Sequence, residues 1–291
     1  MELATAITKT LKREVIASSE RRVSGGSINQ CSGFDTADGP IFVKHGGADC
    51  LPMFEAEAAG LAELARAKAL RVPNVLTVSA ADNTAFLVLE WIELAPAGAR
   101  SEIKLGERLA QQHRVTRDRF GWDRDNTIGS TPQANRPSAQ WIEFLREQRL
   151  MPQLALAKQN GASVDVIDRG LQLCERLEDF FVGYQPAPSL LHGDLWGGNW
   201  GADVSGEPVL FDPAVYFGDR EADLAMTRLF GGFGASFYSA YQSAWPLAAG
   251  AEVRVTLYNL YQVLNHFNLF GGGYLRQALG MIQRLLAETR H

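Results

Sequence analysis

The sequence predicts an α+β protein with two lobes: a small lobe made of an antiparallel sheet and a helix, and a larger, mostly helical lobe. Two observations predict this class. The first ninety residues have the pattern of short strands around one helix, whereas helical periodicity dominates after residue 93. The chain has 291 residues, which is enough for two domains. We therefore expect a small lobe over 1–93 and a large lobe over 94–291.

The elements of the small lobe follow from turn signals and periodicity. Asp38-Gly39-Pro40 has the composition of a tight turn, so a strand is expected to return after it. Residues 54–70 are rich in Ala, Leu and Glu, which favour a helix. In chain order we expect a helix over 1–19, a strand at 21–23 leading into a glycine-serine stretch at 24–27, a strand over 41–44, the helix over 54–70, and strands over 75–78 and 85–92.

The large lobe is expected to begin after a connection at 94–98 that is rich in helix-breaking residues. Long helical patterns then cover 163–182, 220–230 and 252–288. A non-helical segment at 190–219 interrupts them and contains short strand-like pieces. The junction between two lobes is a common place for a ligand cleft.

Composition and charge argue against several classes of protein. The 28 basic and 33 acidic residues leave a net charge of −5, which does not favour non-specific binding to nucleic acid. Cys31, Cys50 and Cys174 lie far apart, without histidines at metal-ligand spacing, so neither a disulfide framework nor a structural zinc site is expected. No apolar run approaches the ~18 residues of a membrane span, and no signal peptide is recognisable. We therefore expect a cytoplasmic protein that binds neither nucleic acid nor membranes.

The densest polar segment in an apolar neighbourhood is His192-Gly193-Asp194-Leu195-Trp196-Gly197-Gly198-Asn199, which Asp212 follows. A carboxylate and an amide stand five residues apart on this glycine-rich loop, and a second carboxylate ends the next strand. Mg²⁺ prefers one or two carboxylates plus phosphate oxygens, and a carboxylate beside a hydroxyl can accept its proton. Asp, Gly and Asn are also ordinary turn residues. All three in this order before Asp212, however, match the catalytic loop of phosphoryl-transfer enzymes of the protein-kinase-like type.

A kinase also needs a lysine that holds the nucleotide's phosphates and a helix glutamate that holds the lysine. Lys44 ends a predicted strand, and two glutamates begin the helix that follows. Glu57 shares a helix face with Leu61 and Leu64, whereas Glu55 shares one with alanines. Because the larger side chains mark the packed face, Glu57 points inward and requires a cation. We therefore expect Lys44 to pair with Glu57 rather than with Glu55.

Two further parts of a nucleotide site are inferred from position. Neither GxxxxGK[ST] nor GxGxxG occurs, which excludes a Walker-type site. Gly25, Gly26 and Ser27 lie in the first hairpin, where small residues let backbone N–H groups approach phosphates. A plain hairpin turn explains these residues nearly as well. The last strand of the small lobe runs into the connection between the lobes, so backbone groups of Glu90 and Ile92 are candidates for binding the adenine edge.

These motifs and several others are shared with a known family. The residues that carry the resemblance are 25–29, 42–44, 53–57, 126–133, 192–199, 211–214, 218–225 and 264–274. On these residues the chain resembles the fructosamine kinases, or ketosamine-3-kinases, of the aminoglycoside-phosphotransferase-like superfamily. The resemblance spans almost the whole chain, and the His-Gly-Asp-Leu-Trp and Asn-Thr-Ile-Gly-Ser-Thr segments narrow it to this family.

The resemblance implies a reaction and the residues that perform it. Asp194 would be the catalytic base, and Asn199 and Asp212 would be magnesium ligands. Lys44 and Glu57 would anchor the phosphates. The implied reaction moves the γ-phosphoryl group of ATP, with Mg²⁺, to the 3-hydroxyl of a sugar attached to an amine. Small ketosamines or glycated protein lysines would be the substrates, and the unstable product would release the sugar and so repair the glycated amine.

The acceptor side of the implied site is less defined. Trp196 would lie beside the acceptor, where its ring offers an apolar face or a cation–π surface. A tryptophan buried in the core is an equally open alternative. Residues 126–133 are expected either to shape the acceptor cleft or to form a capped turn, and His266 is expected to be a structural residue of its helix.

Other polar residues near the loop are interpreted as structural. His192 is expected to brace the catalytic loop rather than to act as a base. Asp219 precedes a helix and fits its N-cap, and both Asp219 and Asp223 are expected to be structural within a stretch that supports the loop. Ser27 stands where some family members carry a redox-active cysteine, so a disulfide-linked dimer is not expected through Cys31, four residues later.

Two other functions stay open from the sequence. One is a kinase of another small hydroxylated amine, such as an aminoglycoside or choline. The other is a nucleotide-binding scaffold without turnover, whose usual mark is the loss of the lysine, the aspartates or the asparagine, all of which are retained. A monomer is favoured, although the sequence does not define the oligomeric state.

Overall fold

The structure is a computed structural model that describes residues 2–23 and 30–289. Its small lobe contains a five-stranded antiparallel sheet with the strand order β1-β2-β3-β5-β4. The strands are β1 (Val15–Arg22), β2 (Gln30–Thr36), β3 (Gly39–Gly47), β4 (Val75–Ala81) and β5 (Thr84–Glu90). A short 3₁₀ turn, η1 (Ala48–Cys50), leads from β3 into a helix.

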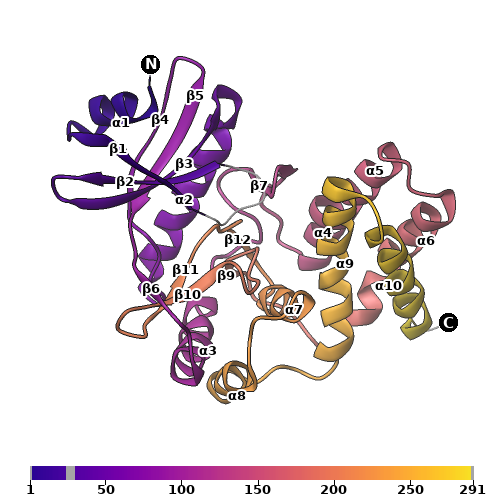
Figure 1. The fold of residues 1–291 in the computed structure, drawn as a ribbon. Coiled ribbons are helices and arrows are strands. Elements are labelled where there is room, and N and C mark those ends of the chain that lie inside the picture. The colour runs from indigo at the N-terminus through magenta and orange to yellow at the C-terminus, as the bar shows by residue number, and fades with distance from the viewer. Residues whose placement is uncertain (1, 24–29, 290–291) are drawn as a thin grey trace.

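Two helices cover opposite faces of this sheet (Figure 1). α1 (Leu3–Leu11) packs with Phe86 and Val88 of β5, whereas α2 (Leu51–Ala67) packs with Leu87 and Leu89. Side chains alternate between the faces along each strand. Since Val43 belongs to the α1 side, its neighbour Lys44 faces α2.

The predicted helix over 1–19 is wrong beyond Leu11. Lys12 takes a left-handed conformation, with φ of 55°, and its N–H donates to the carbonyl of Thr8, which ends the helix. The chain then continues as β1, where buried Val15 is followed by mostly exposed residues. Pairing with β2 determines the conformation of this segment. Hydrogen bonds to a neighbouring strand stabilise it more than an isolated helical turn would, because a short helix without packing is unstable in water.

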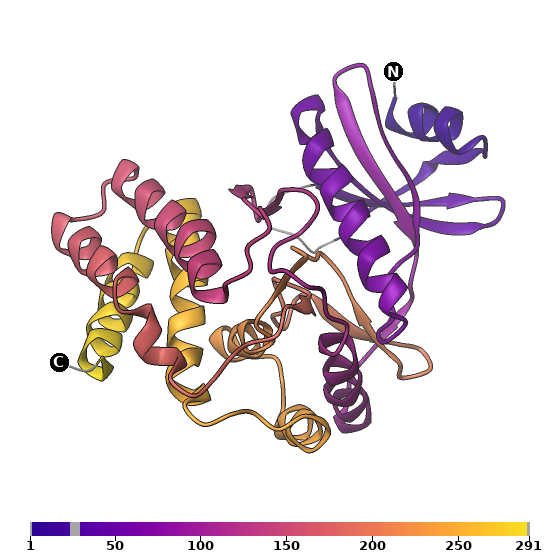
Figure 2. The ribbon, with the colours of Figure 1, turned by 180° about the vertical axis from the view of Figure 1, so that it is seen from behind.

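The large lobe contains most of the helices (Figure 2). Its elements up to the catalytic loop are β6 (Leu94–Ala95), α3 (Ala99–His113), β7 (Asn126–Ile128), β8 (Thr131–Gln133), α4 (Trp141–Leu145), the π-helical turn η2 (Arg146–Leu150), α5 (Met151–Gln159), α6 (Val164–Cys174), the 3₁₀ turn η3 (Leu177–Phe181) and β9 (Ser189–Leu191). After the loop come β10 (Trp200–Asp203), β11 (Pro208–Leu210), β12 (Tyr216–Gly218), α7 (Glu221–Leu229), α8 (Ala235–Ala244), α9 (Ala251–Phe270) and α10 (Tyr274–Glu288).

Two of the predicted long helices are divided in the structure. The pattern over 163–182 ends as an α-helix at Cys174 and continues as η3. The pattern over 252–288 breaks after Phe270, where Gly271 and Gly272 have φ of 67° and 66°. These two glycines adopt a conformation that other residues rarely take, so α9 ends there and α10 folds back against it.

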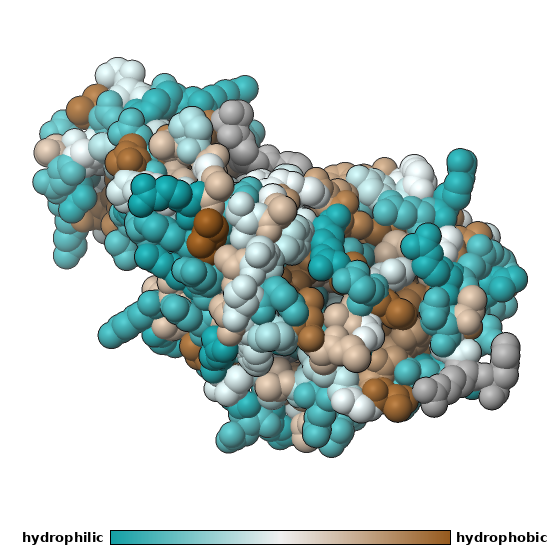
Figure 3. Space-filling view, turned by 90° about the horizontal axis from the view of Figure 1, so that it is seen from below, coloured by the Kyte–Doolittle hydropathy of each residue, from teal (hydrophilic) through white to brown (hydrophobic). Residues whose placement is uncertain are grey.

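The non-helical segment at 190–219 forms the base on which the two lobes meet. β9 pairs with β12, and β10 pairs with both β11 and β6, so the connection at 94–98 contributes a short strand. The two-lobed α+β class is confirmed, while the division at residue 93 stays a prediction. On the face seen from below, hydrophilic side chains lie mainly toward the edges, and less polar and hydrophobic ones show across the middle (Figure 3). Among the described residues, no helix is both long enough and apolar enough to cross a membrane.

Candidate active site

A cavity of about 1190 Å³ opens between the two lobes. Its walls come from the sheet and α2 on one side, and from the loop 194–199, the segment 211–214, the β7–β8 hairpin and α9 on the other. Typical small-molecule pockets are about 300–1,000 Å³. This cavity therefore has room for a nucleotide and a second substrate together.

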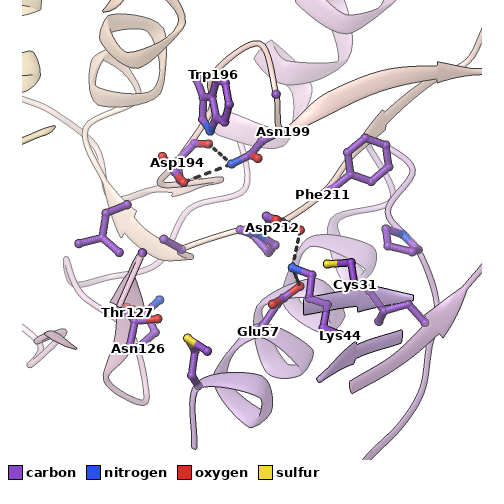
Figure 4. Close-up of a pocket in the computed structure, with 18 of the residues that line it drawn as sticks. Cys31, Lys44, Glu57, Asn126, Thr127, Asp194, Trp196, Asn199, Phe211 and Asp212 are labelled. Atoms are coloured by element: carbon purple, nitrogen blue, oxygen red, sulfur yellow. Dashed lines mark hydrogen bonds and ion pairs between the residues drawn. The ribbon is translucent and has the colours of Figure 1, made fainter. Parts of the chain in front are cut away.

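Lys44 is held between two carboxylates at the centre of the cavity (Figure 4). Its Nζ lies 2.7 Å from Oε1 of Glu57 and 2.5 Å from Oδ1 of Asp212. Burial alone would lower the pKa of Lys44, but the two carboxylates outweigh it and hold that pKa above its usual value. Lys44 therefore stays charged, and the expected pairing with Glu57 rather than Glu55 is present.

The carboxylates of the cavity outnumber its cations. Lys44 is the one lysine or arginine among the described residues that line it. The acidic residues that line it are Glu57, Glu90, Glu93, Asp194 and Asp212. An excess of hard oxygen donors suits a divalent cation such as Mg²⁺, particularly when phosphate oxygens complete its shell. Across residues 2–23 and 30–289, no cluster of three or more His, Cys, Asp or Glu side chains could hold a metal ion. Oxygen atoms of the phosphates would therefore have to complete the coordination of Mg²⁺.

Asp194 and Asn199 face each other across the loop between β9 and β10 (Figure 4). The Nδ2 atom of Asn199 donates to the main-chain oxygen of Asp194 at 2.8 Å and to its Oδ2 at 3.2 Å. These contacts occupy the nitrogen of the amide and leave its oxygen available for a ligand. Burial, reinforced by the charge of Asp212, raises the pKa of Asp194 to about 7.

The backbone of the loop is held by Asp223 from α7. This carboxylate accepts the N–H of His192 at 2.7 Å and the N–H of Gly193 at 2.8 Å. Gly193 has φ of 83°, and a Cβ atom there would lie 2.0 Å from the carbonyl oxygen of Ala214. Only glycine fits this close approach. The supporting role expected for Asp223 is therefore visible as two hydrogen bonds to the loop.

His192 ties the loop to the strand that precedes Asp212. Its Nε2 lies 2.7 Å from the carbonyl oxygen of Phe211, so this nitrogen carries the proton, and Nδ1 accepts the N–H of Asp194 at 3.3 Å. Burial lowers the pKa of His192, which favours the neutral ring. The structure thus shows the bracing contact expected of this residue.

Asp219 makes the contact of an N-cap at the start of α7, because its Oδ1 accepts the N–H of Glu221 at 3.0 Å and Arg220 between them already has a helical conformation. Its carboxylate also accepts hydrogen bonds from the hydroxyls of Tyr184 and Tyr258 within the core. The residue is 1% exposed and lies outside the lining of the cavity. A buried carboxylate needs such donors, so the position is structural.

The predicted nucleotide contacts of the small lobe are present only in part. Glu90 and Ile92 both line the cavity. The N–H of Glu90, however, donates to the carbonyl of Asn74 at 2.8 Å and is not available to a ligand. Its carbonyl and the backbone of Ile92 remain candidates. Gly25, Gly26 and Ser27 lie outside the described residues.

Trp196 lines the cavity and is 39% exposed, so the alternative of a buried core tryptophan is wrong. A Cβ atom at Gly198 would lie 2.3 Å from the indole ring. Only glycine at this position therefore leaves room for the ring over the loop. The ring meets Phe230 edge-on at 6.4 Å, and Phe230 lies 4.7 Å from the ring of His266. Aromatic faces therefore form one end of the cavity.

The β7–β8 hairpin is fixed beside the catalytic segment. Asn126 donates from Nδ2 to the carbonyl of Val215 at 2.8 Å, and its Oδ1 accepts from Gln133 and Asn135. Asn126 and Ile128 are buried, so the intervening Thr127 faces the cavity (Figure 4). Residues 126–129 thus line the cavity, and the segment 126–133 forms a hairpin rather than a capped turn.

Sequence reasoning missed the contribution of α9. Gln262, Asn265 and His266 line the cavity from this helix. The Nδ1 atom of His266 lies 2.8 Å from the main-chain oxygen of Gln262, so it carries the ring proton and leaves Nε2 as an acceptor. Three polar residues within five positions of this helix were the available signal.

Comparison with known proteins gives relatives along the whole chain. A family model described as Fructosamine kinase matches residues 1–288. A probable ketoamine kinase from Synechocystis sp. is 43% identical over 287 residues, which cover 98% of this chain and 96% of that protein. The chloroplastic protein-ribulosamine 3-kinase of Arabidopsis thaliana is 41% identical over 268 residues, covering 91% of this chain and 81% of that protein.

Solved structures share the same fold. The crystal structure of a putative fructosamine-3-kinase from Thermobifida fusca matches with a TM-score of 0.86 at 32% identity, covering 98% of this chain and 99% of that one. A ternary complex of an aminoglycoside phosphotransferase with ADP and hygromycin B matches with a TM-score of 0.62 at 15% identity, covering 99% of each chain. The second likeness shows the fold alone, which is that of the protein-kinase-like phosphotransferases.

Proposed function

Because the chain belongs to the fructosamine kinase family, we propose that it is an ATP-dependent kinase of ketosamines. The acceptor is the 3-hydroxyl of a ribulosamine or fructosamine, which are sugars attached to an amine. The single observation that carries the proposal is that Lys44, Asp194, Asn199 and Asp212 all line one cavity between the lobes. A scaffold without turnover would have no need to keep all four.

Asp194 is the proposed general base. Its pKa of about 7 is matched to proton transfer near neutral pH, where a base must be partly ionised and still basic enough to take the hydroxyl proton. Asn199 restrains the carboxylate by two hydrogen bonds from its amide nitrogen. Asp194 would thus orient the 3-hydroxyl and accept its proton as the phosphoryl group arrives.

Lys44 and Glu57 are the proposed phosphate-anchoring pair. The ammonium group is buried and its position is fixed by carboxylates from α2 and from the end of β11. Glu57 would hold Lys44 in place when a phosphate competes with Asp212 for the ammonium group. The backbone of Ile92 and the carbonyl of Glu90 are proposed to face the adenine edge, with Gly25, Gly26 and Ser27 near the phosphates.

Asp212 and Asn199 are proposed to hold Mg²⁺ through their side-chain oxygens. When bound, the ion would neutralise the charge on the phosphates of ATP. The excess of carboxylates over cations in the cavity supports this assignment. Asp212 has φ of 53°, a strained conformation for a residue with a side chain, and such strain is concentrated at functional sites.

Trp196 is proposed to contact the acceptor. Its exposed face, next to Phe230 and His266, offers a surface on which a sugar ring or a protonated amine can stack. Small ketosamines and ketosamines on protein lysines both present these groups.

We also propose that the protein is a monomer in the cytoplasm. Size-exclusion chromatography with light scattering tests the oligomeric state.

The test is ATP consumption with a panel of acceptors. Ribulose-lysine and fructose-lysine are compared with an aminoglycoside and with choline at equal concentrations. We expect kcat/KM for the better ketosamine to exceed that for either other amine by about 100-fold or more, because a site built for specific hydroxyls rejects ligands that leave them unpaired. Faster turnover of the aminoglycoside or of choline would overturn the proposal in favour of that acceptor.

A further inference from the structure

Gln262 is a buried polar residue of the cavity to which the proposed chemistry assigns no part. It lies in the middle of α9, lines the cavity and is 6% exposed. α9 packs against α7, α10 and α5, so its position is set by the core of the large lobe. Gln262 is therefore presented to the cavity from a rigid element.

A hydrogen bond of the Gln262 side chain distinguishes the nitrogen of its amide from the oxygen. Nε2 of Gln262 donates to the carbonyl oxygen of Gly193 at 3.4 Å. A carbonyl oxygen can only accept, so the nitrogen must be the atom on this side and the oxygen the atom on the other. Gly193 directly precedes Asp194, which places Gln262 against the backbone of the catalytic loop.

The oxygen of the same amide has no partner. Oε1 of Gln262 is buried and makes no hydrogen bond within residues 2–23 and 30–289. Buried acceptors without a donor are rare because they lose their hydrogen bonds to water and gain none in return. An unpaired acceptor on a residue that lines a ligand cavity points to a donor supplied by the ligand.

The chemistry of the site limits what that donor can be. The oxygen atoms of phosphates are acceptors, so an amide oxygen repels them and does not recognise ATP through its phosphates. His266, one turn further along α9, also presents an acceptor, because Nδ1 is bonded to the main-chain oxygen of Gln262. Phe230 and Trp196 complete this end of the cavity, and of these two side chains only the indole N–H of Trp196 is a donor. A hydroxylated amine carries O–H and N–H groups that can donate to the acceptors of Gln262 and His266.

We propose that Gln262 binds the sugar–amine acceptor by accepting a hydrogen bond at Oε1 from one of its hydroxyl or amine groups. Its Nε2 meanwhile restrains the carbonyl of Gly193, so occupancy by the acceptor is coupled to the backbone that carries Asp194. The inference rests on the proposed function, since it names a residue that selects the acceptor of that reaction.

The test replaces the amide by a chain of similar length without hydrogen bonds. For Gln262→Met, KM for fructose-lysine should rise by about three- to tenfold, the size expected for one neutral hydrogen bond, while KM for ATP stays within about twofold. Gln262→Asn keeps a polar amide but withdraws it by one methylene, and it should give the same selective rise. Thermal melting of both variants shows that the fold is retained, and if the methionine variant does not fold, the asparagine variant decides.

Gln112 provides the matched control. It lies on α3, is fully buried, has no partner for either amide atom within the described part of the chain, and does not line the cavity. Gln112→Met should leave both KM values within about twofold of the wild type.

Three outcomes would overturn the inference. An unchanged KM for fructose-lysine in both Gln262 variants would show that Gln262 makes no hydrogen bond to the acceptor. A fall in kcat alone would reduce Gln262 to a residue that positions the loop. A wild-type enzyme that phosphorylates no ketosamine would overturn the proposed function and this inference together, and that result is distinct from an active wild type with unaffected variants.

Discussion

Removal of the Asp223 carboxylate should destabilise the protein and disable the catalytic loop together. Asp223 is 1% exposed and accepts the N–H groups of His192 and Gly193 at 2.7 and 2.8 Å. Hydrogen bonds to a charged group contribute about 1.5–3 kcal/mol each, so the two bonds to the loop contribute at least about 3 kcal/mol together. We therefore expect Asp223→Ala to lower the free energy of unfolding by about 3–5 kcal/mol.

The loss should be measurable by heat and by denaturant. At about 2–4 °C per kcal/mol for a protein of this size class, the melting temperature should fall by about 6–20 °C. Asp165→Ala is the control, because the carboxylate of Asp165 accepts a hydrogen bond from Arg169 at 2.7 Å on the surface of α6. Exposed pairs contribute about 0–1 kcal/mol, so this variant should be close to the wild type.

The effect of Asp223→Ala should depend on pH in a defined direction. Burial raises the pKa of Asp223, but the hydrogen bonds from His113 and from the N–H of Gly193 outweigh it, and the pKa lies below its usual value. The folded state thus binds this proton less readily than the unfolded chain does. The stability that Asp223 contributes is present above the unfolded-state pKa of about 4 and is lost on acidification below it.

Activity completes this test. In the folded fraction of Asp223→Ala, kcat should fall by at least about tenfold, because the peptide groups beside Asp194 lose both restraints, whereas KM for ATP should change little. A variant that loses less than about 1 kcal/mol of stability and keeps kcat within about twofold would refute the reasoning that Asp223 holds the loop.

Three further predictions concern the reaction and the loop. Asp194→Ala should lower kcat by about 10²–10⁴-fold with little change in ATP binding by calorimetry, and a loss below about tenfold would count against the assigned base. Asp212→Asn should raise the Mg²⁺ concentration for half-maximal rate by about fivefold or more, since asparagine tolerates the left-handed backbone but lacks the charge; an unchanged metal titration would assign the ligand elsewhere. His192 should stay neutral and protonated on Nε2 by ring-nitrogen chemical shifts, because burial lowers its pKa. The unfolded chain then takes up the proton first, so acidification below about pH 6.5 opposes folding at this residue, and a charged ring at neutral pH would contradict the assignment.

The parts of the site that the sequence predicted are those fixed by local regularity. Alternation along β3 and helical spacing along α2 were enough to pair Lys44 with Glu57. The spacing of five residues likewise brought Asp194 and Asn199 onto one loop, where they contact each other. The two-lobed class followed because periodicity changes from strands to helices along the chain.

The remaining features depend on contacts between distant segments. Lys44 and Asp212 are 168 residues apart, and no local pattern encodes their contact at 2.5 Å. Residues 15–19 of β1 were mistaken for helix because pairing with β2, a segment that follows later in the chain, decides their conformation. The part of Gln262 became visible only in the folded large lobe, where α9 brings this residue to the cavity and its buried Oε1 has no partner within the described residues.

The central claim is that the cavity between the lobes carries a phosphoryl group from ATP to the 3-hydroxyl of a ketosamine. Phosphorus NMR of the product formed from ATP, Mg²⁺ and fructose-lysine or ribulose-lysine tests it most directly. We expect a new phosphomonoester resonance coupled to the proton at carbon 3 of the sugar, with one ADP formed for each. A phosphomonoester at another hydroxyl, or ADP and inorganic phosphate formed while the ketosamine stays unchanged, would contradict it.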